Sequence, residues 1–423
     1  MAKKTNFLLH LHPERVPVSV LRFSHTFGLG GMTALLIVVQ LVTGVFLRFV
    51  YQPDPAGAYR SILVMQQEIP LGLFFRNLHH WGASLLVVTA TLHLLRVFYT
   101  GAFYPPVRSG NWVIGMIMLL LLLLSNFTGY LLPWDQLAYW AVTVVTTLPG
   151  YLPGIGESMV EWLRGGSEVN GVTLRIFFNL HTAVLPFSLF ALMLFHFWRV
   201  RRAGGVVRPP DAGRGTLPAV PHLVVREAAV ASLLLAFLAL TALLFNAPLQ
   251  APADPAHSPD PAKAPWYFLG IQELLLHFHP LVSAILIPFT VLLFFFLLPY
   301  LPYDERRPGV PFYSSRGRRM TRTAAVAALL LTPLFIVAGE YLLSFHSWFP
   351  TWPPLLSEGV VPLLLYLLPV AALALLMKRR HRPNTGEAVT ALVTFLVVTY
   401  TLLTLTALWF RGEGMTLTWP WKP

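Results

Sequence analysis

The sequence predicts an all-α integral membrane protein, in which a four-helix bundle is followed by about five further transmembrane helices. Of its 423 residues, 56% are hydrophobic and only 11% are charged, whereas a soluble domain carries about 25% charged residues. Apolar runs of about 20 residues, long enough to cross a bilayer, recur along the whole chain. These observations exclude a water-soluble globule.

Nine apolar runs, bounded by charged residues, proline and glycine, are predicted to span the membrane. The front half holds 28–51, 71–99, 112–132 and 174–198, and the rear half holds 228–245, 281–298, 324–343, 360–376 and 388–408. Between the halves, residues 202–218 have the composition of a linker. We therefore expect an N-terminal domain over 1–215 and a C-terminal domain over 216–423.

The basic residues are distributed among the loops of a membrane protein and do not form a surface for nucleic acid. The net charge is +12, but the clusters at 199–208, 306–319 and 378–382 all fall in loops on one side of the predicted membrane. The loops on the other side hold only Arg60, Arg164 and Lys263. The positive-inside rule then places the N-terminus inside and the C-terminus outside. We expect no nucleic-acid partner.

The chain contains no cysteine. This excludes a disulfide, a thiolate nucleophile, an iron–sulfur cluster with cysteine ligands and a haem attached by a thioether.

Two predicted outer loops, 133–173 and 246–280, are unusually long. They are rich in Trp, Tyr, Pro and Gly, and long loops in compact proteins are commonly functional. We expect short interfacial helices in both.

Two predicted helices carry a histidine near each end: His79 and His93 on the second span, His181 and His196 on the fourth. Ionisable side chains inside a membrane are costly and are usually functional. At 100° per residue, the 14-residue step returns to within roughly 40° of the same helix face, and the 15-residue step to within roughly 60°. The members of each pair lie about 21 Å apart along the helix axis. The topology therefore stacks two bis-histidine sites across the membrane.

Both helices run from outside to inside, which pairs His79 with His181 at the outer level and His93 with His196 at the inner level. Tetrahedral zinc would need four ligands at one level, whereas two imidazoles are suitable axial ligands for a b-type haem. The pattern therefore predicts two noncovalent b haems in the core of a four-helix bundle.

Glycines on the first and third spans repeat the histidine interval. Gly30 and Gly44 are 14 residues apart, as are Gly115 and Gly129. They would leave space for a flat porphyrin, although close helix packing is the competing explanation. Arg76 and Arg96 each lie three residues from a histidine. They would pair with haem propionates or extend to the membrane interface.

At these residues the sequence resembles the cytochrome b subunit of quinol-oxidising cytochrome bc complexes, with features closest to the chloroplast type. The stretches that carry the resemblance are 28–44, 76–103, 129–142 and 179–200, with a weaker match at 261–275.

The resemblance implies that the four histidines ligate two b haems, with quinol oxidised on the outer side and quinone reduced on the inner side. It implies a Rieske iron–sulfur protein, a c-type cytochrome and the membrane quinone pool as partners, in a homodimer of complexes. The protein would be a catalytic subunit of a quinol:cytochrome c oxidoreductase in a prokaryotic inner membrane, contributing to a proton gradient.

The sequence departs from the family at the outer pocket. The family's Pro-Glu-Trp-Tyr signature is here Ala264, Pro265, Trp266 and Tyr267, so the carboxylate thought to accept a quinol proton is missing. Gly28 stands where the chloroplast-type subunit attaches an extra haem, so no covalent haem is expected. Candidates for the proton acceptor are Glu273, which we favour, His277 and Asp260. Six residues of the two long loops are candidates for the walls of this outer pocket, with anchoring in the aromatic belt as the alternative. They are Trp134, Asp135, Tyr139, Trp140, Trp266 and Tyr267.

An inner quinone site would use His25, His222, Arg226 and Glu227, although the topology alone also explains Arg226. Two other functions fit parts of the pattern. A dihaem membrane anchor that links quinone to a soluble dehydrogenase or reductase would need the histidines but not the long loops. A transporter with structural histidines would contain no haem. The ninth span, 388–408, exceeds the family's usual number of helices.

Overall fold

The computed structural model describes residues 13–104, 106–210, 213, 215–303, 312, 314–343 and 345–419. In this part of the chain, 9 helices are long and apolar enough to cross a membrane. Each of them coincides with one of the predicted runs, so the prediction of an all-α membrane fold is confirmed.

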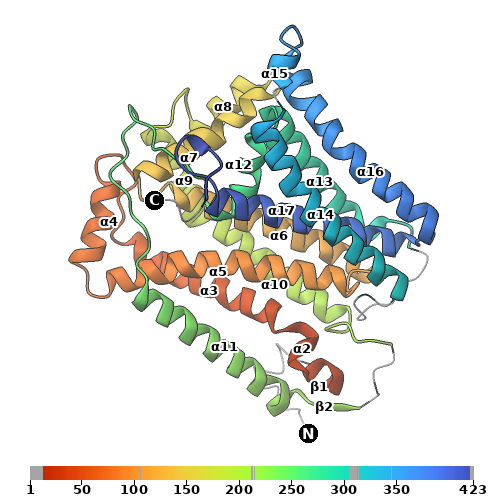
Figure 1. The fold of residues 1–423 in the computed structure, drawn as a ribbon. Helices are drawn as coiled ribbons and strands as arrows, with labels where there is room; N and C mark the ends of the chain where they lie inside the picture. The colour runs from red at the N-terminus through yellow and green to blue at the C-terminus, as the bar shows by residue number, and fades with distance from the viewer. Residues whose placement is uncertain are drawn as a thin grey trace.

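The front half forms the four-helix bundle. Its spans are α3 (Leu29–Arg48), α5 (Gly72–Tyr99), α6 (Pro106–Tyr130) and a fourth span in which α9 (Gly171–Asn179) continues into α10 (Leu185–Arg202). Helix α3 packs along α5, and α10 packs along α6 (Figure 1). Leucines such as Leu36, Leu86, Leu122 and Leu189 fill the middle of the bundle.

The rear half adds five spans. They are α11 (Ala219–Leu244), residues Leu281–Leu286 with α13 (Ile287–Leu297), α14 (Ser315–Tyr341), residues Leu355–Val360 with α16 (Val361–His381), and α17 (Thr385–Trp409). Helix α11 packs against α5 along one edge of the bundle, while α17 packs along α14 (Figure 1). A capping box formed by Asn384 and Glu387 begins α17.

Shorter elements lie at the two ends of the spans. The loops contain α4 (Ala58–Gln67), α7 (Gln136–Thr147), α8 (Gly156–Arg164), α12 (Leu269–Leu275) and α15 (Phe345–Trp348). The long outer loops thus contain short helices, as expected. At the other end, α2 (Phe23–Thr26) follows β1 (Arg15–Pro17), which pairs antiparallel with β2 (Thr216–Pro218), Val16 opposite Leu217. This pairing joins the two halves next to the predicted boundary at 215/216, and the division itself stays a prediction.

Three spans contain one widened, π-helical turn, at Leu180–Val184, Leu281–Leu286 and Leu355–Val360. Each turn ends shortly before a proline: Pro186, Pro288 or Pro362. A proline has no N–H for the helix ladder, and its ring collides with the preceding turn. Widening that turn relieves the collision without ending the helix.

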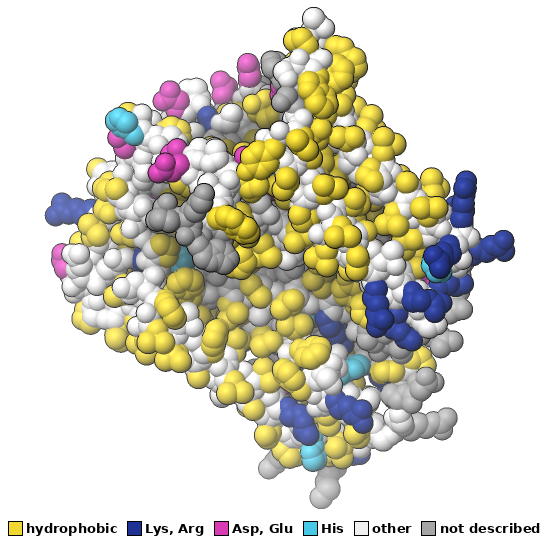
Figure 2. Space-filling model, viewed as in Figure 1, with side chains coloured by type: hydrophobic (Ala, Val, Ile, Leu, Met, Phe, Trp, Pro, Cys, Tyr) yellow, Lys and Arg dark blue, Asp and Glu magenta, His cyan; other side chains and the backbone are white. Residues whose placement is uncertain are grey.

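Basic and acidic side chains lie mainly at opposite ends of the spans. Figure 2 shows Lys and Arg gathered at one end and Asp and Glu at the opposite end. Exposed basic residues at the first end include Arg319, Lys378 and Arg379, and exposed acidic residues at the other include Glu157 and Glu161. This is the charge asymmetry that the positive-inside rule uses, and the orientation that we derived from it remains a prediction.

Candidate functional site

The four predicted histidines form two facing pairs inside the bundle. The ring centroids of His79 and His181 lie 6.0 Å apart with an interplanar angle of 80°. Those of His93 and His196 lie 6.5 Å apart at 77°. Two metal–nitrogen bonds of about 2 Å plus the radii of the two rings come to about this separation. Each pair is therefore spaced to hold one metal ion between its rings.

The outer pair is oriented by hydrogen bonds to its Nδ1 atoms. The Nδ1 of His181 donates to the carbonyl oxygen of Ser125 over 2.8 Å, because a carbonyl can only accept. The Nδ1 of His79 lies 2.8 Å from Oγ1 of Thr43, whose hydroxyl donates to the carbonyl of Val39. This arrangement leaves the Nε2 lone pair of both rings available for a metal, as is usual for ligating histidines.

Each of the four predicted glycines faces one of the four histidines. A Cβ added to Gly129 would lie 2.4 Å from Cε1 of His181, and one on Gly44 would lie 3.3 Å from Cε1 of His79. At the inner level, a Cβ added to Gly30 would lie 3.1 Å from Cε1 of His93, and one added to Gly115 would lie 3.8 Å from Cε1 of His196. Gly129, Gly30 and Gly44 therefore leave room for the imidazoles, in addition to any porphyrin beside them, whereas a Cβ on Gly115 would be in ordinary contact.

The widened turn explains why the two histidine intervals differ. His181 lies within the turn Leu180–Val184. Such a turn accommodates one additional residue without advancing the helix face. The 15-residue step from His181 to His196 therefore has nearly the rotation of a 14-residue step, which matches His79 and His93 on the other helix.

Paired histidines alone are not a complete site for a free metal ion. Among the described residues, no group of three or more His, Cys, Asp or Glu side chains is arranged to hold a metal. An ion between two imidazoles would need its other ligands from elsewhere, and a porphyrin supplies four nitrogens in one plane. The donor set therefore fits axial ligation of haem.

Arg76 and Arg96 bind backbone carbonyls at the two ends of α5. Arg76 is 7% exposed and donates to the carbonyls of Ala247 and Pro248 at 2.8 and 2.7 Å. Arg96 donates to the carbonyl of His25 at 3.2 and 2.9 Å. Both guanidinium groups thus tie α5 to neighbouring segments, and a pairing with propionates remains a prediction.

The two long outer loops pair with each other. The backbone N–H of Ala253 donates to the carbonyl of Trp134 at 3.1 Å, and that of Gln136 donates to Ala251 at 2.8 Å. Asp135 caps α7 by accepting from Ala138, and its second oxygen accepts from the N–H of Gln250 at 3.0 Å. Residues that lie more than one hundred positions apart in the sequence thus bring the two loops together as one layer over the bundle.

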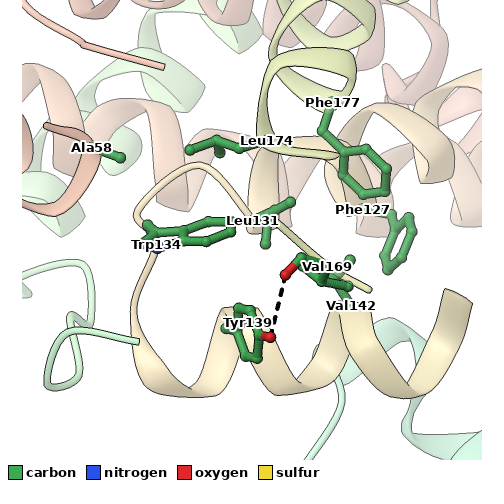
Figure 3. Close-up of a cluster of buried hydrophobic side chains, with 9 residues drawn as sticks. All are labelled: Ala58, Phe127, Leu131, Trp134, Tyr139, Val142, Val169, Leu174 and Phe177. Carbon is green, nitrogen blue, oxygen red and sulfur yellow. Dashed lines mark hydrogen bonds between the residues drawn. The ribbon is translucent and has the colours of Figure 1, made fainter. Parts of the chain in front are cut away.

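Several predicted pocket walls lie in the core of this layer. Trp134 and Tyr139 are 8% and 7% exposed and pack with Leu131 and Phe177 (Figure 3). The hydroxyl of Tyr139 donates to the carbonyl of Val169. These contacts give Trp134, Asp135 and Tyr139 structural roles, and a place for them at the outer pocket stays a prediction.

An apolar groove of about 340 Å³ lies between α5 and α11. Trp81 and Val88 line it on α5, Phe237 and Thr241 line it on α11, and the predicted Trp266 completes it. Trp81 is two residues from His79 on the same helix, so the groove reaches the level of the outer pair. Tyr267 lies next to Trp266, with ring centroids 5.7 Å apart. Burial, together with nearby Tyr130, raises the pKa of Tyr267.

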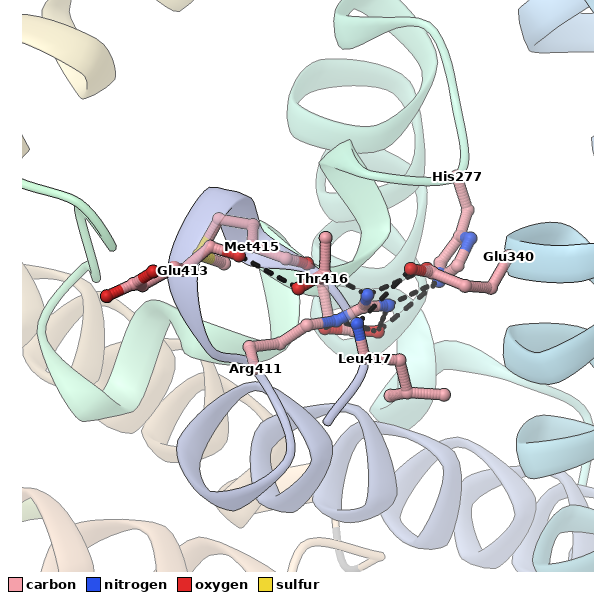
Figure 4. A network of polar contacts seen from close by, with 8 residues as sticks. His277, Glu340, Arg411, Glu413, Met415, Thr416 and Leu417 are labelled. Atoms are coloured by element: carbon pink, nitrogen blue, oxygen red, sulfur yellow. Dashed lines mark hydrogen bonds and ion pairs between the residues drawn. The ribbon is translucent and has the colours of Figure 1, made fainter. Parts of the chain in front are cut away.

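Glu273, the favoured proton acceptor, pairs with Arg411 and His277. Figure 4 shows Arg411 in this network together with His277 and Glu340. The side chain of Glu273 is 0% exposed and lies 2.6 Å from Nη2 and 3.0 Å from Nε of Arg411. Burial alone would raise the pKa of Glu273, but hydrogen bonds from His277 and Arg411 and the charge of Arg411 hold it below its ordinary value. A carboxylate held ionised in this way is a poor proton acceptor. The geometry favours a structural role for Glu273, and His277 belongs to the same network.

The predicted inner residues lie on α2 and at the start of α11. Nε2 of His25 donates to the carbonyl of Val207 at 2.7 Å. Burial lowers the pKa of His25, the bond to Val207 opposes this, and the charge of Arg96 lowers it further. Arg226 donates to the carbonyl of His222 at 2.5 Å, and Glu227 follows on the same helix. These residues share one end of the molecule, since β1 pairs with β2 directly before α11.

Three residues at these sites, Thr43, Arg411 and Glu340, are not indicated by the sequence patterns above. Thr43 directly precedes Gly44, so a search for hydroxyl groups beside the glycines would have found it. Arg411 pairs with Glu273 across 138 residues, and no local pattern indicates such a pairing.

The fold and these pairs define a class: multi-pass membrane proteins whose four-helix bundle holds two stacked pairs of histidines. The family described as Cytochrome b/b6/petB matches residues 16–204. Cytochrome b6 of Prochlorococcus marinus (strain AS9601) is 43% identical over 176 residues, which are 42% of this chain and 80% of that protein. Cytochrome b6 of Picosynechococcus sp. (strain ATCC 27264 / PCC 7002 / PR-6) is 42% identical over the same share of this chain and 79% of its own. The chain belongs to the cytochrome b/b6 family.

The rear half, beyond these matches, is similar to a solved structure. A chain described as "Hyperthermophilic respiratory Complex III" matches with a TM-score of 0.65 and 24% identity, covering 90% of this chain and 91% of that chain. This likeness shows that the fold extends beyond the four-helix bundle.

Proposed function

We propose that this chain is the dihaem cytochrome b subunit of a quinol-oxidising complex, with front and rear domains at 1–215 and 216–423. The observation that carries the proposal is the pair of stacked histidine sites, each imidazole faced by a glycine. His79 and His181 would hold the outer b haem, and His93 and His196 the inner one. When bound, such haems accept and donate single electrons.

Residues of this chain would position quinol on the outer side of the membrane and quinone on the inner side. On the outer side, the groove lined by Trp81 and Trp266 would hold the apolar part of a quinol at the level of the outer histidines. The outer and inner histidine pairs lie at two levels about 20 Å apart along the helices. Electrons passing from the outer to the inner level would therefore cross most of the membrane. On the inner side, His25, His222, Arg226 and Glu227 are the candidates for binding a quinone and supplying protons.

Two one-electron acceptors are needed for a bifurcated oxidation, and this chain carries no cysteine for an iron–sulfur cluster. A Rieske protein and a c-type cytochrome are therefore the proposed partners, with the quinone pool as substrate and the inner membrane of a prokaryote as location. The paired outer loops favour this function over a dihaem anchor, because they cover the outer histidine level with an ordered layer.

The test is to purify the chain alone and together with the proposed partners. We expect about two noncovalent b haems per chain and no quinol:cytochrome c turnover without the Rieske protein. Turnover that needs only a soluble dehydrogenase would support the dihaem anchor instead. Absence of haem after expression with adequate haem supply would contradict the proposal and favour a transporter.

Replacing Thr43 by valine is expected to weaken the outer site. The substitution removes the hydroxyl that accepts from Nδ1 of His79, and loss of such a partner typically lowers metal affinity about 10-fold or more. Redox titration of both haems measures the effect, which should appear in the outer midpoint potential or occupancy alone. Thr33→Val is the control because Thr33 donates only to the carbonyl of Leu29 on the same helix. Equal changes in both variants would contradict the assigned role.

A further inference from the structure

The C-terminal helix α17 contacts the segment that carries Trp266 and Tyr267. The hydroxyl of Tyr400 donates to the carbonyl of Tyr267 at 2.7 Å. A Cβ added to Gly270 would lie 2.6 Å from the ring of Tyr400 and 2.9 Å from Oγ1 of Thr404. Helix α17 therefore packs directly on the backbone at the start of α12.

The last turn of α17 and the residues after it hold the chain that directly precedes this segment. Nζ of Lys263 donates to the carbonyl of Leu408 at 3.1 Å, and the N–H of Gly414 donates to Oδ1 of Asp260 at 2.6 Å. Residues 410–418 fold back on themselves, with a bridge between Arg411 and Leu417. The chain just before Trp266 is thus held by residues that lie about 150 positions further along the sequence.

Arg411 makes the strongest of these contacts (Figure 4). Its side chain is 1% exposed and binds both oxygens of Glu273, while Nη1 lies 2.7 Å from Glu340 on α14. Two parallel N–H···O bonds from a guanidinium group fix orientation as well as distance. Arg411 therefore sets the position of α12 relative to both α14 and α17.

The anchored points lie on both sides of Trp266, which lines the groove: Asp260 and Lys263 precede it, and Tyr267 and Glu273 follow it. Tyr267 and Glu273 are six residues apart on the continuous segment formed by Trp266–Phe268 and α12. Holding both points restricts rotation and translation of this segment. Trp266, next to Tyr267, is the one side chain from this segment that lines the groove between α5 and α11. Its position against Trp81 thus depends on contacts made by α17.

We propose that α17 and residues 410–418 act as a clamp that positions Trp266 and Tyr267 for quinol, with Arg411 and Tyr400 as the positioning residues. This assignment rests on the proposed function and gives a role to the helix that exceeds the family's usual number. Neither residue needs to touch quinol, because both act through the segment that does.

The experiment compares Arg411→Gln and Tyr400→Phe with the wild type in the assembled complex. We expect the KM for quinol to rise about tenfold in Arg411→Gln, which corresponds to about 1.4 kcal/mol of lost binding, and less in Tyr400→Phe. The haem spectra and kcat at saturating quinol should stay near wild type. Hydrogen exchange at residues 264–275 of the same complex should become faster in both variants, which is a readout independent of turnover.

Arg316→Gln is the matched control. Arg316 pairs with the buried Glu387 at 2.8 Å, again between α14 and α17 but at the opposite end of α17. The Arg316→Gln variant should lower the stability of the complex without changing the KM for quinol. The conservative variant Arg411→Lys should restore part of the affinity for quinol that is lost in Arg411→Gln.

Tyr400→Phe keeps the ion pairs and so remains folded. If its KM for quinol and its hydrogen exchange are both unchanged, the clamp is overturned. An equal rise of the KM in Arg316→Gln would also overturn it. A wild-type complex that binds haem but oxidises no quinol would overturn the proposed function itself.

Discussion

His79→Ala is expected to yield a chain that keeps the inner haem and lacks the outer one, and His93→Ala is expected to do the reverse. Each substitution removes one imidazole from a facing pair, with centroids 6.0 or 6.5 Å apart, and leaves the other pair intact. Haem content should fall from about two to about one per chain, and quinol oxidation in the complex should be almost abolished. Reduced-minus-oxidised spectra with pyridine haemochrome quantification measure both quantities.

His80→Ala serves as the control for these variants because His80 is adjacent in sequence but packs against Trp81, with ring centroids 4.9 Å apart. It should retain both haems. Loss of the same haem in His79→Ala and His93→Ala would contradict two separate sites, and retention of both haems in either variant would contradict the assigned ligands.

The second large effect is expected at Gly129. Its added Cβ would lie 2.4 Å from Cε1 of His181, so Gly129→Ala must displace the imidazole or the helix. Overpacking of this kind costs about 1–3 kcal/mol, and a displaced ligand cannot keep its bond to the metal. We expect loss of the outer haem with retention of the inner one, measured by the same spectra.

Gly115→Ala and Gly31→Ala form a graded control series. The added Cβ would lie 3.8 Å from His196 in the first case, which is ordinary contact, and would meet nothing within 4 Å in the second. Both variants should retain two haems. Equal loss of haem at Gly115 and Gly129 would mean that helix packing, rather than clearance for the histidines, explains these glycines.

Much of the architecture could be predicted from local patterns. The nine spans follow from runs of apolar residues, since a bilayer requires each crossing segment to be both long and apolar. The two levels of histidines and the matching interval between the glycines follow from repeated spacing, because a helix converts sequence spacing into rotation and rise. The widened turn at His181 was not predicted, although Pro186 was a signal for it.

At the outer surface, the structure adds contacts that local patterns did not indicate, and the proposed pocket residues and proton acceptor stay predictions. Tyr139 and Asp135 were expected at a pocket, but Tyr139 lies in the hydrophobic core and Asp135 joins two loops. Glu273 was expected to accept a proton, but Arg411 encloses it. For Asp135 and Glu273 the partner comes from a segment more than one hundred residues away, which no local pattern indicates.

The sequence by itself determined the membrane class, the number and order of the spans and the two levels of paired histidines, because these depend on composition and helical periodicity within single segments. Only the tertiary structure decided which glycine faces which histidine, how the outer loops form one layer and what α17 contacts. Contacts such as Arg411 with Glu273 or Tyr400 with Tyr267 span more than one hundred residues. They form only when separate helices pack together, so no periodicity within one helix encodes them.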